Sequence, residues 1–128
     1  MKIHAVVLAA GLGKRMKSTT PKVLHKILGK PIISYITDAI RGVDAVDKTL
    51  VVVSTHTEAI VPLYEGSGVL MAYQRRPLGT ADALISGLTG VGDDLDHLLV
   101  LAGDVPLIRA ETLEALIRQH LSHNNALT

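Results

Sequence analysis

The sequence from Ile3 to His25 reads IHAVVLAAGLGKRMKSTTPKVLH, and this stretch decides the fold. The segment Ile3 to Leu8 is nearly all apolar and rich in β-branched residues, a pattern typical of a strand buried on both faces of a parallel sheet. Gly11 and Gly13 then break the apolar run. We therefore predict a buried first strand that leads into a glycine-rich loop.

The bulk composition narrows the class of protein. The 128 residues include 48% hydrophobic and 20% charged residues, which is the balance of a globular domain with a real core. The net charge of +1 and the near absence of aromatic residues argue against nucleic-acid and membrane partners. The lack of cysteine excludes disulfides and thiolate metal sites. The apolar run Ala5 to Ala10 is too short for a signal peptide, so we expect a soluble, cytoplasmic protein.

Strand-like and helical segments alternate along the rest of the chain. This alternation predicts an α/β fold with a parallel sheet and helices on both of its faces. We place no domain boundary within 1–128. Further strands are predicted at 49–54, 69–73 and 97–102, with the start of a fifth at 126–128. Helices are predicted from Pro31 to the stop at Gly42, from Thr55 to Leu63 with a Thr55–Glu58 capping box, from Thr80 as N-cap to Leu88, and from Glu111 to Leu121.

Three unusual loops follow predicted strands. They span 9–21 after the first strand, 74–80 after the third and 103–107 after the fourth. Ligands of open parallel sheets bind beyond the carboxyl ends of the strands. The shared position of the three loops therefore predicts a single binding site.

The first loop matches neither common phosphate-binding template. A Walker A motif needs glycine at position 8 and Ser or Thr at 15, where this chain has Leu8 and Arg15. A dinucleotide fingerprint needs a glycine at 16, where it has Met16. The loop still offers free backbone N–H groups and nearby positive charge for a phosphate. A glycine turn with solvated basic residues is the open alternative; the basic residues are Lys14, Arg15, Lys17 and Lys22.

Two clusters could suggest a metal site. The acidic run of Asp93, Asp94 and Asp96 is better explained as a solvated loop, since charge runs usually lie on the surface. His120 and His123 have helical spacing, but the sequence offers no third ligand beside them. We expect no metal at either place.

The segment 8–31, LAAGLGKRMKSTTPKVLHKILGKP, resembles the signature of the sugar-1-phosphate nucleotidyltransferases. Within this family it is most similar to the bacterial N-acetylglucosamine-1-phosphate uridylyltransferases, which form the N-terminal half of a bifunctional enzyme; the run PKVLH at 21–25 is distinctive for that branch. Gln74 with LGTA at 78–81, and GDVPLI at 103–108, extend the resemblance. It covers essentially the whole chain in the family's order and spacing.

The resemblance implies a Rossmann-like, three-layer parallel-sheet fold, of which 1–128 would be the N-terminal, nucleotide-binding part. It implies Mg²⁺-dependent transfer of UMP from UTP to N-acetylglucosamine-1-phosphate, which gives UDP-N-acetylglucosamine and pyrophosphate. This product serves peptidoglycan and lipopolysaccharide synthesis. Family members extend well beyond position 128 and trimerise through a β-helical half, so we expect a fragment with little turnover of its own.

The resemblance also implies site residues. Arg15 and Lys22 would be catalytic and neutralise the triphosphate, and Asp104 would be the Mg²⁺ ligand. Backbone groups of 8–11 would hold the nucleotide, while Gln74, Gly79 and Thr80 would recognise uracil. The full set of implied substrate-binding residues is Leu8, Ala9, Ala10, Gly11, Gly13, Lys22, Gln74, Gly79, Thr80, Ala102, Gly103 and Asp104.

Each of these residues has a simpler explanation without the resemblance. Asp104 could begin a turn before Pro106, Gln74 could be a surface residue, Thr80 could serve only as a cap, and Lys22 could be solvated. Two positions also depart from the family pattern: Lys14 replaces the usual Thr, and Asp82 replaces a His that is common in the uridylyltransferases. A thymidylyl-, cytidylyl- or guanylyltransferase and a non-catalytic nucleotide-binding module therefore stay open.

Overall fold

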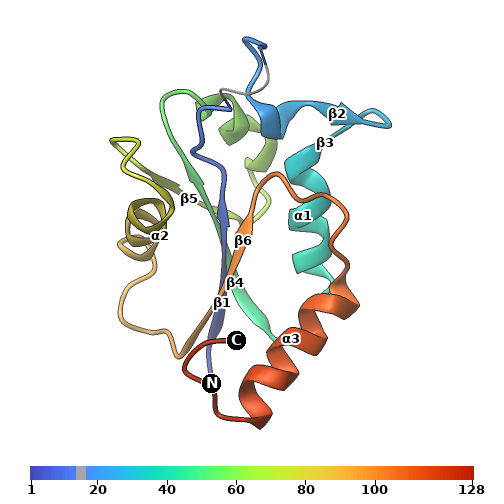
Figure 1. Ribbon diagram of the computed structural model, residues 1–128, viewed down its shortest axis with the longest axis vertical. Coiled ribbons are helices and arrows are strands. Elements are labelled where there is room, and N and C mark those ends of the chain that lie inside the picture. Colours follow the sequence, from blue (N-terminus) through green and yellow to red (C-terminus); the bar gives the residue numbers. More distant parts are fainter. Residues whose placement is uncertain (14–16) are drawn as a thin grey trace.

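A parallel four-stranded sheet forms the centre of the protein in a computed structural model, which describes residues 1–13 and 17–128 (Figure 1). The strand order is β5-β4-β1-β6. β1 pairs in parallel with β4 and with β6, and β4 also pairs in parallel with β5. The strands are β1 (Ile3–Leu8), β4 (Val46–Val53), β5 (Leu70–Tyr73) and β6 (His97–Ala102).

Helices cover both faces of the sheet, as the alternation predicted (Figure 1). On one face, α1 (Ile32–Arg41) and α3 (Ala110–Ser122) pack on the larger aliphatic core. On the other, α2 (Thr80–Leu88) packs on a smaller cluster around Val6 and Val52. The absence of a side chain at Gly87 lets α2 pack closely on the sheet, since a Cβ at this position would lie only 2.9 Å from Cγ2 of Val52.

The two inner strands are buried as continuous apolar runs. Ala5, Val6 and Val7 of β1 are fully buried, and so are residues 50–53 of β4. Helices on both faces of a parallel sheet require such runs, which explains why the strand at Ile3–Leu8 was predictable to the residue.

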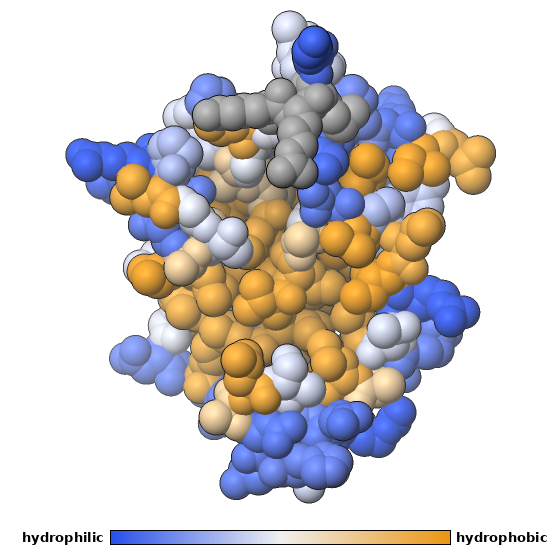
Figure 2. Space-filling view, in the orientation of Figure 1, coloured by the Kyte–Doolittle hydropathy of each residue, from blue (hydrophilic) through white to orange (hydrophobic). Residues whose placement is uncertain are grey.

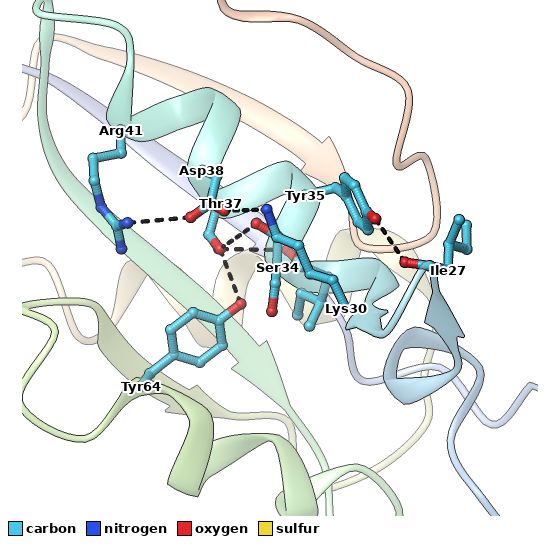
Figure 3. Close-up of polar contacts among 9 residues, drawn as sticks. Ile27, Lys30, Ser34, Tyr35, Thr37, Asp38, Arg41 and Tyr64 are labelled. Carbon is cyan, nitrogen blue, oxygen red and sulfur yellow. Dashed lines mark hydrogen bonds and ion pairs between the residues drawn. The ribbon is translucent and has the colours of Figure 1, made fainter.

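Short elements connect the sheet to α1. They are the 3-10 helix η1 (Lys22–Leu24) and a hairpin of β2 (Lys26–Ile27) and β3 (Lys30–Pro31), none of which the sequence predicted. Tyr35 donates a hydrogen bond to the Ile27 carbonyl at 2.6 Å, and Lys30 forms an ion pair with Asp38 (Figure 3). These contacts hold the hairpin against α1.

Two of the predicted helix starts are wrong. The segment after β4 forms the 3-10 helix η2 (Glu58–Tyr64) with Thr57 as its N-cap, so no Thr55–Glu58 capping box begins it. The Thr57 hydroxyl instead accepts a hydrogen bond from the Ser54 N–H at 2.9 Å. Thr80 is the first residue of α2 rather than its cap, and the N-cap is Gly79.

The predicted start of a fifth strand at 126–128 is also wrong. The chain turns at Asn124, whose φ is +50°, and returns toward α3. Thr128 Oγ1 then lies 2.9 Å from Nδ1 of His120. In the part of the chain that the structure describes, β6 therefore pairs with β1 alone.

The open edge of β6 is apolar. Val100 of β6 and Leu116 of α3 are each more than 40% exposed. Figure 2 shows apolar side chains gathered over the part of this face where β6 lies in Figure 1. Among the described helices, none has the length and apolar character needed to cross a bilayer.

Candidate functional site

A cavity of about 510 Å³ lies where the loops after β1, β5 and β6 meet. The three loops that the sequence singled out thus converge at the carboxyl edge of the sheet. Every substrate-binding residue predicted from the sequence lines this cavity except Gly103. The lining also includes Val23, Pro77 and Ala83, which sequence reasoning did not select.

The backbone of the first loop is fixed where it leaves β1. The Ala9 N–H donates to the Val52 carbonyl at 2.9 Å, and the Ser54 hydroxyl donates to the Ala10 carbonyl at 3.0 Å. Sequence reasoning missed Ser54; the available signal was a small polar residue directly after a buried strand. Because these bonds hold 9–10 rigidly, the next backbone groups enter the cavity wall in a preformed geometry.

Part of the predicted basic set cannot be placed. Lys14 and the predicted catalytic residue Arg15 lie outside the described residues. Gly13 is described; its φ of +58° lies in the region that favours glycine. A Cβ there would lie 3.4 Å from the Lys22 Cβ, so the loop passes directly over Lys22.

Lys22 and Asp104 both line the cavity and form an ion pair with each other. Nζ of Lys22 lies 3.1 Å from Oδ2 of Asp104, and each side chain is 42% exposed. Surface pairs of this kind contribute little to stability, about 0–1 kcal/mol. A half-exposed ammonium group and a carboxylate at the mouth of a cavity are instead suited to a phosphate and to a hard metal ion.

The chemistry of the lining fits Mg²⁺. This ion is commonly held by one or two carboxylates together with substrate phosphates and water. Asp104 is the only acidic residue among the described residues that line the cavity. It is therefore the side chain that would hold the ion there.

Gly103 contributes packing rather than cavity surface. Its N–H donates to the Leu8 carbonyl at 2.8 Å, and a Cβ at this position would lie 2.8 Å from that same oxygen. The ends of β1 and β6 can approach this closely only because residue 103 has no side chain.

Gln74 is buried, so the simpler explanation as a surface residue is wrong. Only 6% of it is exposed. Its Nε2 donates to the Gly79 carbonyl at 3.1 Å and to Oδ2 of Asp82 at 2.8 Å. The sequence marks Asp82 only as a departure from the family pattern and does not predict its contact with Gln74.

The structure places the residues of the two other candidate clusters as follows. Asp94 forms an ion pair with Lys2, whose ammonium group lowers the pKa of that carboxyl, and Asp96 accepts the Lys2 backbone N–H at 2.7 Å. Nε2 of His120 lies 3.2 Å from Nδ1 of His97. His123 does not join this pair, since its Nδ1 lies 3.0 Å from the Gln119 carbonyl oxygen. No group of three metal-ligating side chains occurs in the described part of the chain.

Several known proteins are similar to this chain in sequence. The Bifunctional protein GlmU of Caldicellulosiruptor saccharolyticus is 43% identical over 122 residues, which is 95% of this chain and 26% of the relative. The Bifunctional protein GlmU of Thermosipho africanus is 41% identical over 98% of this chain and 27% of its own length. The chain thus spans about a quarter of the relatives that it matches.

Solved structures show the same fold. A nucleotidyl transferase from Methanothermobacter thermautotrophicus superposes with a TM-score of 0.76 at 26% identity, over 91% of this chain and 57% of that one. A UDP-glucose pyrophosphorylase from Acinetobacter baumannii superposes with a TM-score of 0.80 at 20% identity, over 97% and 54%. The Rossmann-like α/β architecture expected from the sequence is confirmed.

A family model for the MobA-like NTP transferase domain matches residues 5–128, which include every described residue of the cavity. The match therefore rests on the strands of the sheet as well as on the loops at its carboxyl edge. This chain belongs to the family of MobA-like NTP transferase domains.

Proposed function

We propose that this protein transfers UMP from UTP to N-acetylglucosamine-1-phosphate and releases pyrophosphate. The observation that carries the proposal is the cavity at the carboxyl edge of the sheet, with Lys22, Gln74 and Asp104 in one lining. Support for the sugar and the base comes from the resemblance of 8–31 to the N-acetylglucosamine-1-phosphate uridylyltransferases, and the similarity to GlmU proteins agrees with it. Another sugar-phosphate nucleotidyltransferase is the nearest alternative.

The proposed reaction needs no covalent enzyme intermediate. A phosphate oxygen of the sugar phosphate forms a bond to the α-phosphorus of UTP, and the bond from that phosphorus to the bridging oxygen breaks. Pyrophosphate leaves with the electron pair. Catalysis is then a matter of positioning and of charge stabilisation.

Several of the described residues would contribute to this positioning and charge stabilisation. The backbone around 9–11 would approach the nucleotide closely, and Lys22 would neutralise charge that develops on the phosphates. Arg15, outside the described residues, is proposed for the same task. Asp104 would hold Mg²⁺, which, when bound, supplies further charge neutralisation at the phosphates.

The wider setting is also a proposal. The resemblance to the bifunctional uridylyltransferases supports a cytoplasmic role in making precursors of peptidoglycan and lipopolysaccharide. It also supports a homotrimer for the whole protein, without a nucleic-acid or membrane partner.

A second candidate is a nucleotide-binding module without turnover. It is favoured by the small number of charged side chains in the lining, where Lys22 and Asp104 are the only charged residues among those described, because phosphoryl transfer depends mainly on charge stabilisation. The two candidates differ in pyrophosphate release, and both require nucleotide binding.

The experiment combines calorimetry with a pyrophosphate assay. UTP is titrated into the protein with Mg²⁺, and pyrophosphate is then measured with N-acetylglucosamine-1-phosphate, glucose-1-phosphate or no acceptor. UTP binding with acceptor-dependent release supports transfer, and binding without release under every condition supports the module. Failure of UTP, CTP, GTP and ATP alike to bind would contradict both.

A further inference from the structure

The side-chain amide of Gln74 has only one possible orientation. Its Nε2 lies 3.1 Å from the Gly79 carbonyl oxygen and 2.8 Å from Oδ2 of Asp82. A carbonyl oxygen and a carboxylate oxygen accept hydrogen bonds and donate none. The reversed amide would place its own oxygen against both acceptors, so the NH₂ group must face them.

Two features hold these acceptors in place. Gly79 has a φ of +103° and a ψ of −179°, a conformation that is essentially limited to glycine. In this conformation its carbonyl also accepts the Ala83 N–H at 3.1 Å. Asp82 lies in the first turn of α2, where the helix dipole favours a negative charge.

The consequence is that Gln74 offers the cavity one kind of hydrogen bond. Its two N–H groups are used by Gly79 and Asp82, and Oε1 has no protein partner among the described residues. Gln74 lines the cavity beside Gly79 and Thr80. An amide with both donors engaged can only accept.

We propose that Asp82 is a positioning residue that makes Gln74 an obligatory acceptor, and that the site thereby selects a nucleobase with a ring N–H group. Uracil presents a hydrogen on N3, whereas cytosine presents an unprotonated nitrogen there. A site built around a buried hydrogen bond strongly rejects the analogue that leaves it unmade. This inference rests on the proposed nucleotide-binding function, and it assigns base selection to a residue outside the cavity lining.

The orientation itself is tested without nucleotide. In ¹H–¹⁵N spectra, both side-chain amide hydrogens of Gln74 exchange slowly with water in the wild-type protein. The Asp82→Ala substitution should speed the exchange of one of these hydrogens. The Asp82→Asn substitution, which keeps a hydrogen-bond acceptor at this position, should restore slow exchange. Gln74→Ala assigns the two signals. Fast exchange of both hydrogens in the wild type would overturn the proposal.

Selectivity is tested by titrating UTP, CTP and N3-methyl-UTP. The wild type should bind UTP about ten- to a hundredfold more tightly than the other two, as expected for one buried hydrogen bond. Asp82→Ala should lower this preference several-fold by weakening UTP alone, and Asp82→Asn should recover most of it. Asp93→Ala, an exposed acidic residue away from the cavity, is the matched control.

The outcomes separate this inference from the proposed function. Equal affinity for UTP and CTP, or full preference retained in a folded Asp82→Ala variant, overturns the inference and leaves nucleotide binding intact. Absence of binding by all three nucleotides overturns the proposed function and the inference with it. Thermal melting of each variant establishes that the variants compared are folded.

Discussion

Lys22 and Asp104 are 82 residues apart in the sequence, yet Nζ of the lysine lies 3.1 Å from Oδ2 of the aspartate at the mouth of the cavity. The strands bring them together: η1 follows the loop after β1, and Asp104 follows β6, the neighbour of β1 in the sheet. Without ligand the two charges compensate each other. A magnesium nucleotide would give each its own partner, with phosphate for the lysine and metal for the carboxylate.

Asp104→Asn should therefore change UTP affinity in opposite directions with and without Mg²⁺. In EDTA the variant should bind UTP about two- to fivefold more tightly, because a carboxylate beside the phosphates has been removed. With Mg²⁺ it should bind at least about tenfold more weakly, because the proposed metal ligand is lost. Calorimetry under both conditions measures this, with Asp93→Asn as control. A parallel change under the two conditions would argue against the metal role.

Lys22→Ala should weaken UTP whether or not Mg²⁺ is present. Loss of one charge-assisted bond to phosphate costs about 1.5–3 kcal/mol, roughly a ten- to hundredfold loss of affinity. Lys26→Ala removes an exposed lysine on β2 that does not line the cavity, and it should leave the affinity unchanged. Similar losses in both variants would point to a general effect of charge rather than a contact.

The sequence predicted the parts of the fold that local patterns determine. The strands at Ile3–Leu8 and His97–Ala102 were predictable because apolar runs bounded by glycine have few alternatives. The convergence of the three loops followed from the geometry of parallel sheets. The roles of the individual site residues stay predictions.

Contacts between loops were not predictable, because nothing local signals them. The Ser54 hydroxyl donates a hydrogen bond to the Ala10 carbonyl, although the two residues are 44 positions apart in the sequence. The burial of Gln74 depends on how α2 packs against the sheet, because Gln74 donates a hydrogen bond to Asp82 of that helix. Thr80 looked like a cap from its residue type, but Gly79 can adopt a φ of +103° and takes that position. The residue type of Thr80 therefore does not reveal that the residue before it adopts a backbone conformation that favours glycine.

Gly103→Ala should destabilise the protein. A methyl group at this position would lie 2.8 Å from the Leu8 carbonyl oxygen, a backbone atom that can move only if β1 and β6 separate. Overpacking of this kind costs about 1–3 kcal/mol in the free energy of unfolding. Urea denaturation measures it, with Gly11→Ala, where a Cβ meets nothing within 4 Å, as control. Equal stability of both variants would show that the strand ends relax freely.

The buried Tyr64 should make the protein lose stability at alkaline pH. Burial raises the pKa of its hydroxyl above the ordinary value near 10, while Thr37 shares a hydrogen bond with it at 3.1 Å (Figure 3). A raised folded-state pKa gives stability that is complete below pH 10 and is lost as the pH rises through the folded value. Denaturation between pH 8 and 11 should therefore show a decline above pH 10.

Tyr64→Phe should flatten that decline, at a cost of about 0.5–1.5 kcal/mol at neutral pH for the lost hydrogen bond. Tyr73→Phe is the matched control, because Tyr73 is 52% exposed and should leave the decline in place. A decline that persists unchanged in Tyr64→Phe would assign it to another group.

Replacement of His4 by an apolar residue of similar size should stabilise the protein. It lies in the middle of the sheet, is fully buried, and neither ring nitrogen has a hydrogen-bond partner among the described residues. A buried polar group without a partner costs about 1–3 kcal/mol. His4→Leu should therefore raise the free energy of unfolding by about 1–2 kcal/mol, whereas His4→Ala, which leaves a cavity, should lower it. Both are measured by urea denaturation at pH 8. If leucine destabilised the protein as alanine does, the ring nitrogens of His4 would have to be hydrogen-bonded in solution, with buried water as the partner to seek.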